Sequence, residues 1–70
     1  MDTFFFGFGA HVRSLRGMQR LTQEEVAHRA GVHVTYLSGI ERGIRNPSLK
    51  NIRKLALALG VPVKELFYFE

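Results

Sequence analysis

Apolar residues recur every three or four positions along most of this chain, and no segment alternates apolar and polar residues with a period of two. The three-to-four spacing places apolar side chains on one face of an α-helix. Phe5, Phe8, Val12 and Leu15 follow it and predict a first helix over about residues 6–18. The chain is therefore expected to be helical from near its beginning.

Polar motifs mark the ends of two further helices. The run Thr22-Gln23-Glu24-Glu25 is a capping box, in which a Thr hydroxyl and a Glu carboxylate satisfy free N–H groups at a helix start. It begins a second helix, which Gly31 ends. A third helix is expected over residues 33–42, with Gly43 after it. Two short helices joined by a tight turn can form a helix-turn-helix.

Two more helices follow the turn at residues 45–48. Ser48 is placed to cap a fourth helix, whose apolar face runs from Leu49 to Leu59 before Gly60. Pro62 is placed to start a short fifth helix that ends near Phe67. These segments predict an all-α fold, a compact five-helix domain over residues 1–70. Residues 1–6 are either a flexible tail or part of an interface.

A chain of 70 residues buries a small core and needs further stabilisation, commonly disulfides, a metal or oligomerisation. It has no cysteine, which excludes disulfides and thiolate metal sites. Its three histidines show no ligand-like pairing with acidic residues, so no metal is expected. The composition therefore favours a homo-oligomer.

The net charge is +4, and residues 11–54 hold nine Lys and Arg against three Glu. A basic surface attracts nucleic-acid phosphates. No apolar run is long enough to cross a membrane or serve as a signal peptide, so a cytoplasmic protein without a membrane partner is expected. With one aspartate, no Cys nucleophile and no Gly-rich phosphate motif, the sequence predicts neither an enzyme nor a cofactor site.

The two faces of the third predicted helix differ. With Leu37 pointing inward, Ile40 and Glu41 lie on the buried side, at about 100° per residue. The opposite side carries Thr35, Gly39 and Arg42, with Ser38 beside them. This short, polar and basic face suits the base edges and phosphates of a DNA groove.

Three segments together resemble the Cro/Xre phage-repressor-like family: residues 21–32, the stretch Tyr36-Leu37-Ser38-Gly39-Ile40-Glu41-Arg42-Gly43, and Arg45-Asn46-Pro47-Ser48-Leu49. The similarity covers about residues 8–67 and is greatest to small restriction-modification controller proteins. It implies a transcriptional regulator that binds a two-fold symmetric operator in double-stranded DNA as a homodimer. The third helix would then lie in the major groove.

The resemblance implies a role for each matching position. The positions that contact base edges are Val34, Thr35, Ser38 and Gly39. The phosphate contacts are Thr22, Gln23, His33, Tyr36, Arg42, Arg45 and Asn46. Alternatives stay open for several: Val34 as a core residue, Gln23 as merely solvated, His33 as an exposed turn residue, and Tyr36 as packed on the fourth helix.

The resemblance also implies an internal ion pair and a dimer interface. Arg16 and Glu41 form an internal ion pair between the first and third helices. Related proteins dimerise through the C-terminal region, where Leu57, Val63, Leu66 and Phe67 are expected at the interface.

Three residues depart from the family pattern. Arg20 stands where a glycine is usual, so either its backbone is left-handed or the turn differs. His33 replaces the usual serine cap. Gly39 lacks a side chain where relatives often read a base, so recognition is expected to depend more on DNA shape.

Two other functions use the same fold: an antitoxin-like or protein-interaction module, and the DNA-binding domain of a longer ligand-sensing regulator. Neutral replacements of Arg42 and Arg45 would separate DNA binding from protein binding. The residues leave open the operator, any effector, contact with RNA polymerase, and activation versus repression.

Overall fold

The computed structural model describes residues 3–69, which form four α-helices and one 3-10 helix. In chain order these are α1 (Thr3–Met18), α2 (Gln23–Ala30), α3 (Val34–Glu41), α4 (Leu49–Leu59) and the 3-10 helix η1 (Val63–Phe67). The all-α class is confirmed. The fifth element is wrong in kind, because it is a 3-10 helix and not an α-helix.

Helix α1 begins three residues earlier than predicted, at Thr3. The reason is packing against the other end of the chain: the Phe4 ring lies 5.5 Å from that of Phe69, and the Phe8 ring 5.3 Å from that of Phe67. Positions 3–6 of the expected tail are thus helical, and residues 1 and 2 lie outside the described residues. A local pattern could not show this, since the stabilising rings come from the other end of the chain.

Element η1 is a short, tight turn that is closed by a backbone hydrogen bond at its start. Pro62 has an extended backbone, and its carbonyl accepts a hydrogen bond from the Glu65 N–H at 2.9 Å. Short segments with i→i+3 bonds adopt the 3-10 form. The turn places Leu66 inside the molecule, fully buried.

The helix ends follow the predicted capping chemistry. The Thr22 hydroxyl accepts from the Glu25 N–H at 3.0 Å, and the Glu25 carboxylate accepts from the Thr22 N–H at 2.8 Å. The Ser48 hydroxyl caps α4 by accepting from the Asn51 N–H. Arg20 has φ 57°, so the left-handed alternative holds for this turn.

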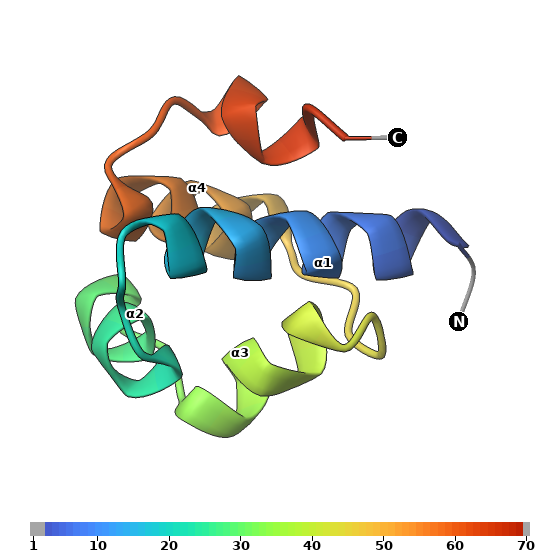
Figure 1. Ribbon diagram of the computed structural model, residues 1–70. Coiled ribbons are helices and arrows are strands. Elements are labelled where there is room, and N and C mark those ends of the chain that lie inside the picture. The colour runs from blue at the N-terminus through green and yellow to red at the C-terminus, as the bar shows by residue number, and fades with distance from the viewer. Residues whose placement is uncertain (1–2, 70) are drawn as a thin grey trace.

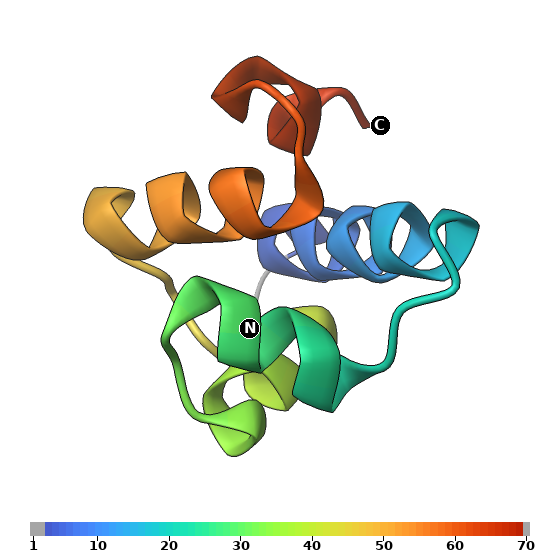
Figure 2. The same cartoon turned by 90° about the vertical axis from the view of Figure 1, so that its left-hand side faces the viewer.

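The helices form three levels (Figures 1 and 2). In both views α1 and α4 lie at the same level, with η1 on one side of them and α2 and α3 on the other. The helix-turn-helix of α2 and α3 therefore lies across the molecule from η1. No helix among residues 3–69 is both long and apolar enough to cross a bilayer.

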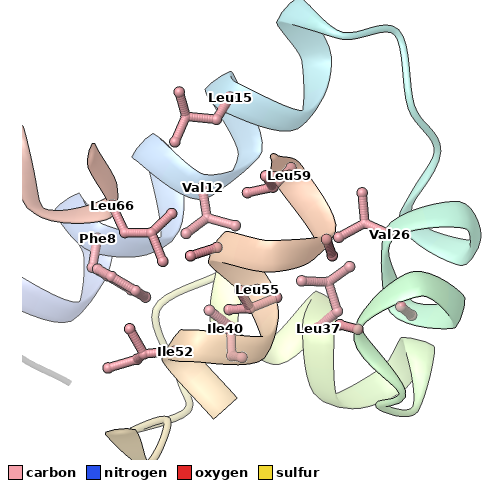
Figure 3. Packing of buried hydrophobic residues seen from close by; sticks show 14 residues of the cluster. Phe8, Val12, Leu15, Val26, Leu37, Ile40, Ile52, Leu55, Leu59 and Leu66 are labelled. Carbon is pink, nitrogen blue, oxygen red and sulfur yellow. The ribbon is translucent and has the colours of Figure 1, made fainter. Parts of the chain in front are cut away.

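One hydrophobic cluster joins all five elements (Figure 3). Leu37 of α3 points into it together with Leu55 of α4, and Val12 of α1 and Leu66 of η1 are equally buried. Glycine also shapes this packing: a Cβ at Gly9 would collide with the backbone carbonyl of Ile40. The core thus fixes α3 against α1 and leaves the other face of α3 outward.

Replacing Leu66 by alanine should lower the free energy of unfolding by about 2–5 kcal/mol, because the change leaves a cavity in the core. Leu49→Ala is the matched control, since Leu49 is 81% exposed. Urea unfolding of both variants measures the difference. Equal losses for the two would show that Leu66 is not part of the core.

Candidate nucleic-acid interface

A tight turn fixes the angle between α2 and α3. Gly31 ends α2 with φ 72°, a left-handed conformation that glycine adopts without steric cost. The Val32 N–H then donates to the Ala27 carbonyl at 3.0 Å, which closes the end of the helix. Helix α3 begins two residues later, so the two helices are held in one relative orientation.

The carboxylate of Glu41 joins the ends of three helices. It accepts two hydrogen bonds from Arg16 of α1, from Nε at 2.7 Å and from Nη2 at 3.0 Å. It accepts a third from the Gln23 amide at 2.9 Å. Arg16 also donates from Nη1 to the Leu21 carbonyl. The two predicted partners therefore lie together, and Gln23 joins them.

Burial explains why this network is complete. The Glu41 side chain is only 2% exposed, and a charge at that depth needs a partner. The hydrogen bonds to Glu41 and the charge of that carboxylate raise the pKa of Arg16 above its usual range.

Gln23 is neither free in solvent nor wholly available to a ligand. One amide N–H points to Glu41, which leaves the second N–H and the amide oxygen. Its backbone lies at the start of α2, beside the exposed Thr22 cap. The hydrogen bonds from Thr22 lower the pKa of Glu25 below its usual value, so α2 begins with a negative carboxylate.

The outward face of α3 carries three of the predicted contacts. Thr35 and Arg42 are exposed, and Ser38 is partly exposed. Val34 is half-buried and packs against the hydrophobic cluster, as the core alternative expected.

Gly39 does not lie open on this face, and the prediction that it contacts a base stays a prediction. It is buried, and an added Cβ would stand 2.6 Å from Cγ of Arg45. Arg45 comes from the loop after α3, and its side chain crosses the helix above Gly39. Helical geometry placed Gly39 outward correctly but could not include a cover supplied by another segment.

Tyr36 lies between this arginine and α4. The Arg45 guanidinium carbon is 5.8 Å from the centre of the Tyr36 ring, a cation–π distance. The Tyr36 hydroxyl accepts a hydrogen bond from the Asn51 amide at 3.0 Å. Asn51 was missed in the sequence, where only its place in the first turn of α4, three residues after Ser48, distinguishes it.

His33 caps α3 by accepting at Nδ1 from the Thr35 N–H at 3.1 Å. This acceptor role requires an unprotonated Nδ1 and puts the ring hydrogen on Nε2. His33 is also exposed, as the alternative of an exposed turn residue expected.

Asn46 is the last of the predicted phosphate contacts. Asn46 is exposed, and it also lines a small apolar hollow with Phe4 and Pro47. Pro47 itself is buried, so the loop from α3 to α4 is anchored to the body of the domain.

The predicted dimer residues divide into two kinds. Leu57 is 70% exposed, and Val63 and Phe67 are each about two-fifths exposed at 41% and 40%. Leu66 is fully buried in its own chain, which corrects its assignment to an interface centre. The α-helical spacing assumed for this segment could not reveal that Leu66 points inward, because η1 is a 3-10 helix and its side chains follow a different period.

This arrangement of a capped α2, a tight turn and a polar, basic α3 face defines a helix-turn-helix DNA-binding protein. The helix-turn-helix family model matches residues 12–66, and the chain belongs to this Cro/Xre-like family of transcriptional regulators. It resembles the restriction-modification controllers within it.

Two curated relatives illustrate the similarity. Control protein C.BamHI of Bacillus amyloliquefaciens is 48% identical over 89% of this chain and 78% of its own length. The cryptic phage CTXphi transcriptional repressor RstR of Vibrio cholerae is 41% identical over 84% of this chain and 53% of its own.

Solved structures of controller proteins are also similar to this chain. The controller protein C.AhdI of Aeromonas hydrophila superposes with a TM-score of 0.89 at 46% identity, covering 90% of this chain and 96% of that one. The controller C.Esp1396I bound to a 19 base pair DNA duplex superposes at 0.87 with 27% identity, over 94% and 88% of the two chains.

Replacing Arg16 by methionine should lower the free energy of unfolding by about 3–5 kcal/mol, because Glu41 would keep a buried charge without its cation. Arg13→Met is the matched control, as Arg13 is an exposed arginine of the same helix. Thermal unfolding measures both. An unchanged midpoint for Arg16→Met would contradict a structural ion pair.

Proposed function

We propose that this protein is a homodimeric regulator that binds a two-fold symmetric DNA operator with α3 in the major groove. The observation that carries the proposal is the outward face of α3, where Thr35 and Ser38 lie beside the exposed cation Arg42. Short hydroxyl side chains can approach base edges closely.

Phosphate contacts would surround this face. The first N–H groups of α2, together with the second N–H of Gln23, suit a phosphate at the helix start. Arg42, Asn46 and the Nε2–H of His33 are exposed donors on the α3 side. Such contacts position a protein on DNA without reading its sequence.

The Glu41 network supports the same function. It holds Gln23 of α2 at a set place relative to α3, because both helices meet at one buried carboxylate. A phosphate contact at Gln23 would therefore set the depth and angle at which α3 enters the groove.

A second copy would bind at the exposed apolar surface of Leu57, Val63 and Phe67. Element η1 lies across the molecule from α3 (Figure 2), so its surface stays free when α3 faces DNA. Two copies related by a two-fold axis would present two α3 helices to successive turns of the groove.

Selection from a pool of random duplexes should enrich a two-fold symmetric site with half-sites about 10 bp apart or a near multiple. Affinity for that site should fall steeply as salt rises from about 50 to about 200 mM, because several phosphates are contacted. Thr35→Ala should weaken discrimination at that site, and Lys64→Ala on η1 is the control. Salt-sensitive binding without enrichment would contradict sequence-specific recognition, and no binding at low salt would favour a protein partner.

Leu57→Glu should convert a dimer into a monomer in sedimentation at tens of micromolar protein, because it places a charge in an apolar interface. Glutamate preserves helix propensity, and Leu57 makes little contact with its own core, so the fold should persist. Leu49→Glu is the control, since Leu49 is an exposed leucine of the same helix. A monomeric mass for the unaltered protein would refute the dimer.

A further inference from the structure

Arg45 occupies the place on the α3 face that a side chain at position 39 would otherwise fill. A Cβ built at Gly39 would meet three atoms of Arg45: Cγ at 2.6 Å, Nε at 3.3 Å and Cδ at 3.5 Å. The arginine stem therefore lies against α3 at Gly39, and a side chain at position 39 would force this stem to shift. Arg45, although it belongs to the loop after α3, therefore forms part of the surface of this helix.

A chain of contacts holds the far end of this side chain. The guanidinium carbon stands 5.8 Å from the centre of the Tyr36 ring. The Tyr36 hydroxyl is in turn bound by Asn51 of α4 at 3.0 Å. An arginine held along its stem and at its head loses less conformational freedom on binding than a free surface arginine.

The donors of Arg45 are not used within residues 3–69. The side chain is exposed, and it makes no hydrogen bond or ion pair there. This distinguishes it from Arg16, whose donors are consumed by Glu41 and Leu21. Because its N–H groups have no hydrogen-bond partner among residues 3–69, this guanidinium can bind a planar pair of acceptors outside the chain.

We propose that Arg45 is a specificity-determining residue that reads a guanine in the major groove, seated by Gly39 and Tyr36. The proposal rests on the proposed function, since it places the α3 face against base edges. The O6 and N7 atoms of guanine present two acceptors that match the arginine fork. Gly39 then contributes to recognition by the space it leaves and Tyr36 by the surface it offers.

The chemistry separates this role from a phosphate clamp. A phosphate accepts from lysine or arginine, so Arg45→Lys would leave a clamp largely working. A bidentate contact to one base depends on the fork and is lost with lysine. Gly39→Ala tests the seat, because its methyl group would displace the stem while Arg45 remains in the chain.

The experiment starts from the site that the unaltered protein selects from random duplexes. Affinities are then measured for that site and for every single base-pair change in it. Arg45→Lys should lose between about 5-fold and about 100-fold in preference for one G·C pair per half-site, with the other positions and the salt slope unchanged. Gly39→Ala should lose preference at the same pair, and the double variant should lose no more than Arg45→Lys.

Two matched controls accompany these variants. One control changes an exposed arginine away from the α3 face, and the other, Gly17→Ala, adds a methyl group in open space on α1. The arginine control is Arg13→Lys, because Arg13 is an exposed arginine of α1 outside the α3 face. Neither Arg13→Lys nor Gly17→Ala should alter preference at that base pair, and circular dichroism should show all variants folded.

The outcomes separate the two proposals. If the unaltered protein enriches no sequence, the proposed function itself fails and takes this inference with it. If it enriches a symmetric site but Arg45→Lys keeps every base preference, only the inference fails, and Arg45 is a phosphate clamp. If Arg45→Lys changes the preference and Gly39→Ala does not, the seating by Gly39 is wrong.

Discussion

The buried carboxylate of Glu41 is the interaction on which the rest of the structure depends. It accepts hydrogen bonds from α1 and α2 while belonging to α3, so three helices are fixed at one point. Because the side chain is almost wholly removed from water, its charge must be met by these donors and cannot be met by solvent. The orientation of the helix-turn-helix follows from that requirement.

The hydrophobic cluster stabilises the fold but does less to fix the angles between the helices. Its members come from all five elements, and dispersion and burial act on them without a preferred angle. The approach of α1 to α3 is instead set by Gly9, where any Cβ would collide with the Ile40 carbonyl. Gly9 and Gly39 both act through the side chain they lack, Gly9 in the packing of α1 on α3 and Gly39 in the placement of Arg45.

The division of the molecule into faces has a functional meaning. Element η1 and the helix-turn-helix lie on opposite sides of the level formed by α1 and α4 (Figure 1). Exposed apolar residues occur on the side of η1, and exposed hydroxyls and cations occur on α3. The surface proposed for a second copy and the surface proposed for DNA therefore lie on opposite sides of this level.

The sequence by itself determined both ends of α2 and the start of α4, because the caps Thr22, Gly31 and Ser48 act on backbone groups within four residues of themselves. It also indicated the family, and with it the pairing of Arg16 with Glu41. Only the tertiary structure decided the cover over Gly39, the burial of Leu66 and the helical start of α1. Each of these depends on a side chain brought from another segment, or on a 3-10 turn whose phase differs from that of an α-helix, and neither leaves a periodic signal in the chain.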